Sequence, residues 1–489
     1  MDFISIQFYI FLGIVVVLYY VVPLRLRWLV LLAGSLTYFA LVTASKRAFV
    51  VFLCIILISW LFGILHHHLA ENGNLSLSIR RLVLALSIAA VLSPLVISRS
   101  DFLLYGLESF LSLDHTGVLI SIGLSFFTMQ IIAYLMDIYW GRVDPQRSLL
   151  KYALFISFFP QLLQGPIPRY EQLEPQLLEG HRFDEDGFAK GFMLLIWGFF
   201  LKLMIADKAG VVVDTIFAEP DLYQGAYVLV GGVLYSIQLY ADFLACVTMA
   251  QGAAALFGIH LADNFDHPYF SMSIKEFWGR WHISLSTWLR DYVYIPLGGN
   301  RKGKLRRYCN LCLTFLVSAL WHGSGLKYLL WGMLHAAYQI TGELTLSVRD
   351  AFFERISIPK NSRKRTLIRG FFTFWFVMLA WIVFRADTIN DALLMLRTLF
   401  TIYNPWIFFD DSLLELGLSW KEWDVLFLSG MVLLAVSILQ EHFVSLCDRI
   451  LAQPFYLRLL LYISAIAAIF VFGTYGYGYN AADFIYGGF

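Results

Sequence analysis

The chain has 489 residues, of which 59% are hydrophobic and 15% charged, and its formal net charge is +1. A soluble domain carries about 25% charged residues, so this composition excludes an ordinary soluble domain and predicts a surface that faces lipid. The small net charge also excludes nucleic-acid binding through a global basic field, and no nucleic-acid partner is expected.

Apolar segments follow one another along the chain. Phe3 to Leu24 is uncharged and long enough to cross a hydrocarbon layer of ~30 Å, and it lacks the flanks of a cleavable signal peptide. Arg25 and Arg27 follow directly, which predicts a cytoplasmic position for this end and an external N-terminus. Further apolar spans are predicted at 28–45, 48–65, 82–98, 117–136, 148–164, 188–206, 222–258, 308–321, 328–342, 366–386, 425–440 and 457–478.

These spans predict an all-α polytopic membrane protein with about eleven transmembrane helices plus re-entrant and interfacial helices. Residues 222–258 are too long for one simple span and indicate a broken or steeply tilted helix. Basic clusters such as Arg301–Arg307 are expected in the cytoplasm, and the acidic stretches Asp101–Asp114 and Asp410–Asp424 outside. Lys46-Arg47 is an exception to this alternation. With no soluble domain or linker evident, residues 1–489 are expected to form a single membrane-embedded domain.

Two Trp-His pairs, Trp281-His282 and Trp321-His322, lie within or beside apolar stretches. An imidazole is costly to hold in hydrocarbon, so such residues are candidates for a functional site. Histidine is also the usual proton shuttle near neutral pH. The alternative for each is a core histidine whose hydrogen bonds are satisfied.

The segment 273–300 has the periodicity of one amphipathic helix. His282 falls on its apolar face and Arg280 elsewhere around it. Gly298, Gly299 and Asn300 then predict a turn. The cationic run Arg301–Arg307 that follows is either a membrane anchor or a contact for the phosphates of an acyl carrier. The face predicted for this helix comprises Trp278, Trp281, His282, Leu285, Trp288, Leu289 and Tyr292.

His322 ends an apolar span and is followed by Gly323, so it can reach a water-filled cavity at a helix break.

His335, His66 to His68 and the cysteines favour structural or interfacial roles. His335 lies within a predicted helix and is interpreted as structural, and His66 to His68 as interfacial rather than metal-binding. Cys309 and Cys312 have no second pair, and no metal site is predicted. No H-E-x-x-H, P-loop or G-x-S-x-G motif occurs, which argues against a zincin, an NTPase or an α/β-hydrolase.

Four segments resemble the membrane-bound O-acyltransferase (MBOAT) family, closest to its bacterial alginate-type branch. The strongest is NFDHPYFSMSIKEFWGRWHISLSTWLRDYVYIPLGGNRKG at 264–303. LWHGSGLKYLLWGMLHA at 320–336 and FFPQLLQGPIPRY at 158–170 resemble further signatures, and FIYGGF at 484–489 is similar to the aromatic tail of alginate-type members. The chain departs from that branch at 243–249, where FLACVTM replaces a Phe-Ser-Gly-Tyr-Ser-Asp-like run, although Tyr240 and Asp242 remain.

The resemblance implies an enzyme of the bacterial cytoplasmic (inner) membrane that carries an acyl group, expected to be acetyl, across the bilayer. The donor would be a cytoplasmic thioester, acetyl-CoA, with no bound cofactor. His322 would act as general base in a central tunnel, and His282 would orient the hydroxyl or polarise the thioester carbonyl. The donor tunnel would be lined by Trp281, Trp321, Arg280, Asn300, Tyr240 and Asp242.

The resemblance also implies partners: membrane lipid, an extracellular SGNH-type protein that accepts acetyl groups, and an exported alginate-like polysaccharide. Within the family, D-alanyl transfer to teichoic acid and peptidoglycan O-acetylation are the alternatives, and the GGNRKG element and the FIYGGF tail favour the alginate-like branch. From another class, the chain could be a proton-coupled transporter, although no paired inverted repeats are visible. A scaffold for a polysaccharide-export complex is a further alternative.

Overall fold

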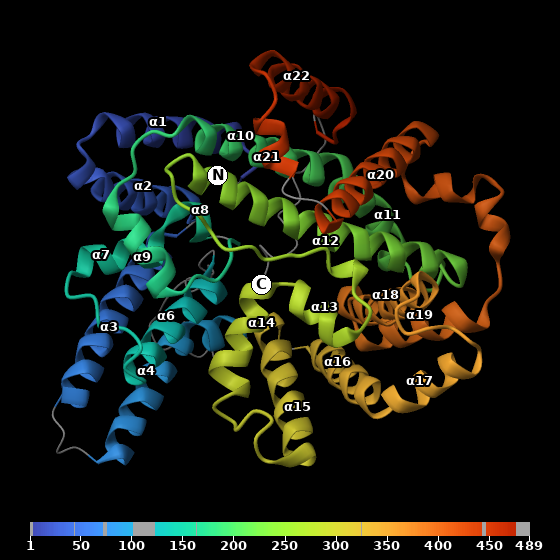
Figure 1. Ribbon diagram of the computed structural model, residues 1–489, viewed down its shortest axis with the longest axis horizontal. Coiled ribbons are helices and arrows are strands. Elements are labelled where there is room, and N and C mark those ends of the chain that lie inside the picture. The colour runs from blue at the N-terminus through green and yellow to red at the C-terminus, as the bar shows by residue number, and fades with distance from the viewer. Residues whose placement is uncertain are drawn as a thin grey trace. The chain divides into compact units, whose positions relative to one another are not determined.

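In the computed structural model of the chain, the residues described are 3–43, 45–71, 76–100, 123–162, 164–323, 325–442 and 446–475. Among them the regular structure is helical, apart from an isolated bridge between Phe265 and Trp281 (Figure 1). The acidic stretch Asp101–Asp114, the start of the predicted span 117–136 and the FIYGGF tail lie outside the described residues.

Eight helices within these ranges are long and apolar enough to cross a membrane, which confirms the predicted all-α polytopic membrane fold. Two shorter apolar helices are Ile6–Val21 and Leu124–Tyr139. The total of about eleven crossings and the central tunnel stay predictions. The eight candidate spans are Leu24–Val42, Lys46–Glu71, Leu77–Ser98, Glu185–Ala218, Ala226–Ala255, Arg363–Arg385, Trp420–His442 and Phe455–Phe472.

The chain forms two compact units, the first lying mainly within residues 3–195 and 246–262. In it α2 packs against α7, and α3 packs against α4 and α6. The predicted span 148–164 is two short helices that meet at the non-helical Phe158. Pro160 has no N–H to donate to the carbonyl four residues earlier, and its ring would clash there. The backbone N–H of Phe159 is satisfied by Ser35 Oγ at 3.1 Å. The helices here are α1 (Ile6–Val21), α2 (Arg27–Val42), α3 (Lys46–Glu71), α4 (Leu77–Ser98), α6 (Leu124–Tyr139), α7 (Leu149–Ser157), α8 (Phe159–Leu162), α9 (Tyr170–Glu179) and most of α10 (Glu185–Phe200).

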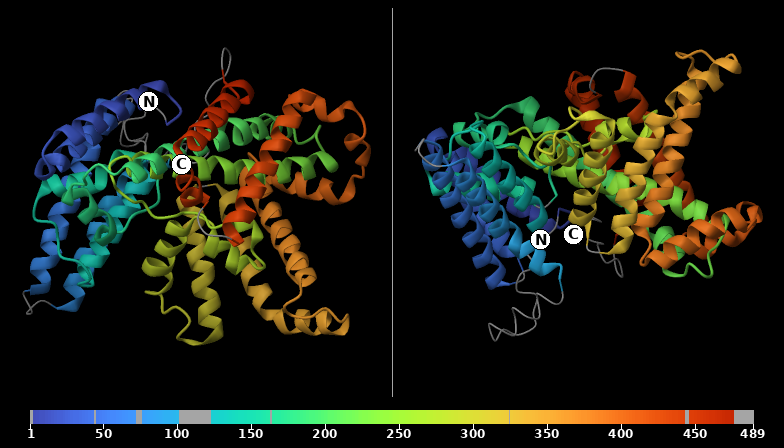
Figure 2. Two further views of the ribbon diagram at one scale, coloured as in Figure 1. Left: turned by 45° about the horizontal axis from the view of Figure 1, so that its top comes forward. Right: turned by 90° about the horizontal axis from the view of Figure 1, so that it is seen from below.

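The second unit lies within residues 196–245 and 263–475. Its α15 and α16 lie side by side in Figures 1 and 2. They approach closely at Gly332, where an added Cβ would lie 2.7 Å from the carbonyl oxygen of Phe315. The helices are α11 (Asp207–Ala218), most of α12 (Ala226–Ala255), α13 (Ile274–Arg280), α14 (Ile283–Leu289), α15 (Gly303–His322), α16 (Leu326–Leu344), α17 (Leu346–Arg355), α18 (Arg363–Arg385), α19 (Ile389–Thr401), α20 (Trp420–His442), α21 (Leu446–Leu451) and α22 (Phe455–Phe472), with short η2 (Leu201–Ala206), η3 (Pro268–Phe270), η4 (Arg290–Tyr294), η5 (Pro405–Phe408) and η6 (Asp411–Leu416).

Two long helical segments bear on the prediction of a broken helix. Of the two alternatives predicted for 222–258, the broken helix is wrong, since α12 runs without interruption through thirty residues, and the steeply tilted helix stays a prediction. The helical segment Glu185–Ala218 instead contains a π-helical stretch, Leu201–Ala206, where the backbone hydrogen bonds change register. π-Helical turns are rare and frequently occur at functional sites. This one contains Lys202, whose side chain is buried.

The prediction of one helix through 273–300 is wrong. The helix ends at Arg280, Trp281 is extended, His282 adopts the left-handed conformation (φ 44°, ψ 56°), and α14 begins at Ile283. The physical reason is competition from a distant segment. Asp266 N–H donates to the Arg280 carbonyl and Ile283 N–H donates to the Asn264 carbonyl, both at 2.9 Å, and these bonds replace those that would continue the helix.

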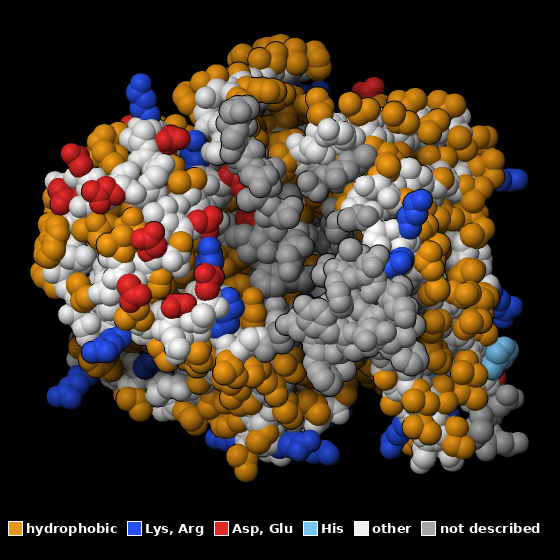
Figure 3. All heavy atoms as spheres, turned by 180° about the vertical axis from the view of Figure 1, so that it is seen from behind, with side chains coloured by type: hydrophobic (Ala, Val, Ile, Leu, Met, Phe, Trp, Pro, Cys, Tyr) orange, Lys and Arg blue, Asp and Glu red, His pale blue; other side chains and the backbone are white. Residues whose placement is uncertain are grey.

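Hydrophobic side chains remain exposed on the predicted lipid-facing helices. The space-filling view of Figure 3 shows them covering much of the visible face, with charged side chains gathered in a few places. On α20, for example, Phe427 is 68% exposed. A soluble protein rarely exposes apolar surface on this scale, and a bilayer would cover it.

Candidate active site

His282 is held at the junction of α13 and α14 by Asn264. Its Nδ1 lies 3.3 Å from Asn264 Oδ1, and the same oxygen accepts hydrogen bonds from the backbone N–H of Ser284 at 3.0 Å and from its hydroxyl at 2.8 Å. Because Oδ1 is an acceptor in all three bonds, Nδ1 must carry the proton in the neutral ring. The Nε2 atom of His282 therefore bears the lone pair and can accept a proton.

The His282 ring is buried, with an exposed fraction of 1%. It lies against Phe243 of α12, with ring centroids 4.7 Å apart. The helices on either side of it have seven residues each and are too short to cross a bilayer. Burial lowers the pKa of His282 to about 3, so the ring is neutral near pH 7 and its Nε2 can accept a hydrogen bond.

His322 ends α15, as the sequence predicted, and is 2% exposed. Its ring is surrounded by other rings, with centroids 4.7 Å from Trp321, 5.0 Å from Trp331 and 5.3 Å from Phe384. The helix ends at Gly323, where a Cβ would lie only 2.2 Å from the Tyr328 ring. A side chain at this position would therefore displace the Tyr328 ring.

Trp321 brings the two histidines into one site. Its ring centroid lies 6.0 Å from that of His282 and 4.7 Å from that of His322. Trp281 belongs to the same aromatic cluster through Trp381, whose centroid is 5.1 Å from Trp281 and 6.0 Å from Trp331. The structure therefore joins both Trp-His pairs, which are remote in sequence, around shared indole rings.

Of the other predicted tunnel residues, Tyr240 is nearest to this cluster, with its ring centroid 6.2 Å from that of Trp281. Asp242 is directed elsewhere: it is buried and its Oδ1 lies 2.8 Å from Lys202 Nζ, which also lies 3.0 Å from Asp207. Asn300 is exposed in the turn before α15.

Arg280 is engaged by carboxylates. Its guanidinium donates to both carboxylate oxygens of Glu441 at 2.9 Å and lies 3.3 Å from Glu276. Its side chain is thus committed to the end of α20, and its assignment to the donor tunnel stays a prediction.

His335 and His66 to His68 contact neighbouring side chains, and the structural and interfacial roles predicted for them stay predictions. His335 lies within α16, where its Nδ1 accepts a hydrogen bond from the Trp278 indole at 3.2 Å. His66 Nε2 is hydrogen-bonded to Ser87 Oγ at 3.1 Å, and His67 and His68 lie beside Glu71 at the end of α3.

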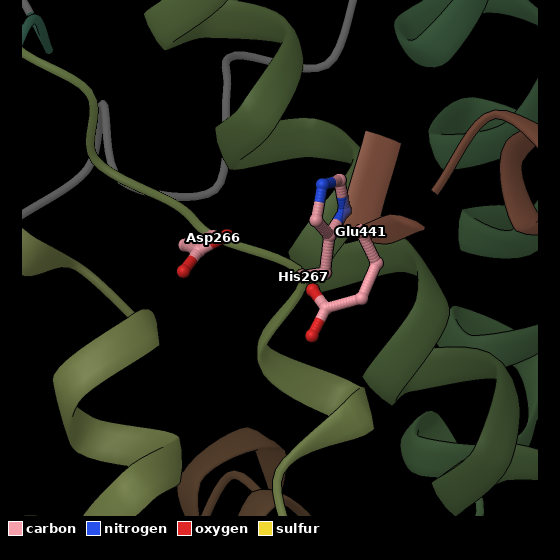
Figure 4. Close-up of side chains that lie close together, drawn as sticks. All are labelled: Asp266, His267 and Glu441. Carbon is pink, nitrogen blue, oxygen red and sulfur yellow. The ribbon is translucent and has the colours of Figure 1, made fainter. Parts of the chain in front are cut away.

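One group among the described residues has the spacing of metal ligands: Asp266, His267 and Glu441, whose ligand atoms lie within 4.8 Å of one another. Figure 4 shows Asp266 and His267 on one loop and Glu441 on α20. Arg280 donates to both oxygens of Glu441, so a guanidinium already occupies the position that a metal ion would take at that carboxylate. The arrangement therefore favours an ion-pair network over a metal centre.

Sequence reasoning assigned no role to Asn264, Trp331, Trp381 or Phe384. The available signal for Asn264 was its place as the first residue of the most specific motif, 264–303. Nothing local in the sequence indicates its partner, because the hydrogen bonds to His282 and Ser284 join residues 18 and 20 positions away.

The fold and site define a polytopic helical membrane protein with a buried pair of histidines. The family model described as "MBOAT, membrane-bound O-acyltransferase family" matches residues 143–385. The chain is also 34% identical over 412 residues to the probable alginate O-acetylase AlgI of Azotobacter vinelandii. This alignment covers 82% of this chain and 78% of the relative. The chain therefore belongs to the membrane-bound O-acyltransferase family, and the predicted resemblance is confirmed.

Two further relatives align over a shorter region. The probable alginate O-acetylase AlgI of Pseudomonas fluorescens is 40% identical over 301 residues, 62% of this chain and 57% of that protein. The peptidoglycan O-acetyltransferase of Helicobacter pylori is 35% identical over 311 residues, 57% of this chain and 56% of the relative. Each of these alignments spans little more than half of the relative's length.

Proposed function

We propose that this chain is a bacterial inner-membrane O-acetyltransferase. It would move an acetyl group from acetyl-CoA on the cytoplasmic side across the bilayer, for O-acetylation of an exported, alginate-like polysaccharide. Family membership and the similarity to alginate O-acetylases support this assignment. The observation that carries it is the meeting of His282 and His322 around Trp321 in a buried aromatic site.

In the proposed reaction, His322 takes the proton from an attacking hydroxyl. The hydroxyl oxygen forms a bond to the thioester carbonyl carbon, the carbon–sulfur bond breaks, and the proton passes from His322 to the departing thiolate. No net charge is created, and no oxidant or reductant is required. The chemistry needs a neutral imidazole that can accept a proton, and a position shielded from water limits hydrolysis of the thioester.

The tautomer of His282 favours one of its two predicted roles. A neutral ring protonated on Nδ1 presents an acceptor at Nε2, and it has no second N–H with which to polarise a carbonyl. We therefore assign His282 to orienting the acceptor molecule: its Nε2 would accept a hydrogen bond from a hydroxyl other than the attacking one, whose single proton goes to His322. The bond of His282 to Asn264 would hold the ring in that tautomer.

The route of the acyl group belongs to the same proposal. A central tunnel would carry it past Trp281, Trp321 and Tyr240 to an acceptor on the outer face. That acceptor would be an extracellular SGNH-type partner or the glycan itself. An SGNH-type gene beside this one would support polysaccharide acetylation, whereas a carrier-protein ligase gene would favour D-alanylation.

Two related acyl-transfer reactions and one function of a different class remain as alternatives. The Helicobacter pylori relative supports peptidoglycan O-acetylation as the second candidate, and D-alanyl transfer to teichoic acid is the third. A proton-coupled transporter would use the same buried histidines to relay protons. Proton flux into reconstituted liposomes, in the absence of any thioester, would favour the transporter.

The decisive experiment compares two buried histidines of the same aromatic cluster. Glutamine cannot take up a proton, so His322→Gln should reduce acetyl transfer from acetyl-CoA by about 10²–10⁴-fold, the usual contribution of a general base. His335→Gln is the matched control, because His335 is equally buried and its ring lies 5.2 Å from the same Trp331. The measurement is radiolabelled acetyl appearing on exported polysaccharide, normalised to membrane-inserted protein.

The two variants separate catalysis from packing. If His322→Gln retains wild-type transfer, or if both variants lose activity equally, His322 is not the base. A wild-type chain that turns over D-alanyl thioesters but not acetyl-CoA would instead select the D-alanyl alternative.

A further inference from the structure

A cavity lies apart from the two histidines, neither of which lines it. It has a volume of about 390 Å³, within the range of small-molecule sites. Its walls come from α12, from the loop around η3 and from α20, and they are almost entirely apolar. Among the residues that line it are Leu234, Ile237, Phe270, Leu426, Met431 and Leu434.

The cavity opens on the lipid-facing side of α20. Three of its lining residues are strongly exposed: Phe427 at 68%, Met431 at 50% and Leu434 at 43%. They belong to a candidate membrane span, Trp420–His442, so we expect the mouth of the cavity to meet hydrocarbon rather than water. Its lining follows α20 from Trp423 to Ser437, a length of about 21 Å at the helical rise of 1.5 Å per residue.

This cavity is an open groove, and one of its ends is polar and carries an excess of negative charge. His267 lines the groove, and Glu441 lies one helical turn beyond Ser437, the last lining residue of α20. Glu276 and Glu441 pair with a single guanidinium, that of Arg280, and the carboxylate of Asp266 lies close to that of Glu441. Because Glu441 is next to the last residue of a membrane-spanning helix, this end lies where lipid head groups are expected.

We propose that the groove binds one alkyl chain of a bilayer phospholipid whose ethanolamine head group lies at the Asp266–Glu441 end. The apolar walls accommodate the chain, the mouth allows entry from the bilayer, and the surplus carboxylates attract a primary ammonium. The proposal goes beyond acyl transfer and does not depend on it.

The groove shares a wall with the candidate active site. Tyr240 and Tyr269 line the groove, and their ring centroids lie 6.2 Å and 6.1 Å from Trp281 on the other side. Tyr269 is fixed by its hydroxyl, which donates to the carbonyl of Ser236 at 2.6 Å. A bound chain would therefore support the aromatic wall that leads to His282.

Gly430 allows a direct test. It borders the groove, and an added Cβ would meet nothing within 4 Å, so phenylalanine can occupy the space that the lipid chain would fill. Gly13 on α1 is the matched control, since it also lies in an apolar helix with nothing within 4 Å of an added Cβ but does not border the groove.

The experiment uses the full chain, stripped of lipid in detergent and titrated with dioleoylphosphatidylethanolamine or dioleoylphosphatidylglycerol under native mass spectrometry. We expect one saturable ethanolamine lipid on the wild type and on Gly13→Phe, and binding weakened about tenfold or more in Gly430→Phe. Glu441→Gln should reduce the preference for ethanolamine over glycerol head groups.

Three results would overturn the proposal: no saturable lipid on the wild type, equal affinity for the two lipids, or unchanged binding by Gly430→Phe. The wild-type titration decides the matter even if Gly430→Phe does not accumulate. Because the readout is bound lipid and not acetyl transfer, an inactive but lipid-binding chain would count against the proposed enzyme function alone.

Discussion

At the scale of single residues, the candidate site depends on one amide oxygen. Asn264 Oδ1 receives hydrogen bonds from His282 and from both donors of Ser284, while the Asn264 carbonyl receives the N–H of Ile283. These bonds stabilise a left-handed conformation at His282, which is unfavourable for a residue with a Cβ. Asn264 is thus a positioning residue, since it acts through the imidazole.

This role predicts the behaviour of Asn264→Ala. Removing the acceptor releases the Nδ1 proton of His282 and frees the ring to change tautomer and orientation. We expect turnover to fall by about tenfold to a hundredfold, as is typical when a group that orients a functional histidine is lost. Asn264→Asp keeps an acceptor oxygen and should recover part of the activity. Kinetics measured beside thermal stability in detergent check this, and full turnover in folded Asn264→Ala would refute it.

At the scale of helices, α12 presents different faces to different partners. Tyr240 and Phe243 contact Trp281 and His282, whereas Asp242 pairs with Lys202 of the π-helical stretch. Helical geometry explains the division, because positions 240 and 243 share a face and position 242 does not. The pairing links α12 to the segment Glu185–Ala218 through charges that are 2% exposed.

We therefore expect Asp242→Asn to affect stability more than chemistry. Breaking a buried ion pair costs about 3–5 kcal/mol, and the remaining partner Asp207 should keep the loss near or below the lower end of that range. Turnover per folded molecule should stay close to wild type. Thermal unfolding and acetyl transfer, measured on the same preparation, test both parts. A folded Asp242→Asn protein that has lost turnover would restore the assignment of Asp242 to the donor tunnel.

At the scale of the whole chain, positive charge at the ends of spans predicts the topology. Arg27 also has a structural role, since its guanidinium bonds to the carbonyls of Tyr20, Val22 and His181 and lies over the rings of Tyr19 and Tyr20. The basic run Arg301–Arg307 follows the turn that leads into α15. Both sites are expected to face the cytoplasm, with the start of α1 outside.

Protease accessibility tests this topology. An epitope tag placed before α1 should be removed by protease added to intact spheroplasts, because that end is external. A tag inserted after Lys302 should be protected until the cells are lysed. The opposite pattern would reverse the orientation and place the proposed donor entrance on the wrong side of the membrane.

The sequence by itself determined the class of this protein. Long apolar spans, few charges and the 264–303 motif require no tertiary information, because helix formation in hydrocarbon is dictated locally by the need to satisfy the backbone. It also indicated both histidines and the helix end at His322. Residue types alone, and the glycine that follows His322, were sufficient for these predictions.

Only the tertiary structure decided how these parts meet. The helical periodicity of 273–300 was misleading, because hydrogen bonds from the distant Asn264–Asp266 segment outcompete the local helix at Trp281 and His282. The joining of both Trp-His pairs at Trp321, and the direction of Asp242 away from them, likewise depend on packing between helices far apart in sequence. A one-dimensional pattern records which face of a helix is apolar, but it does not record which partner covers that face.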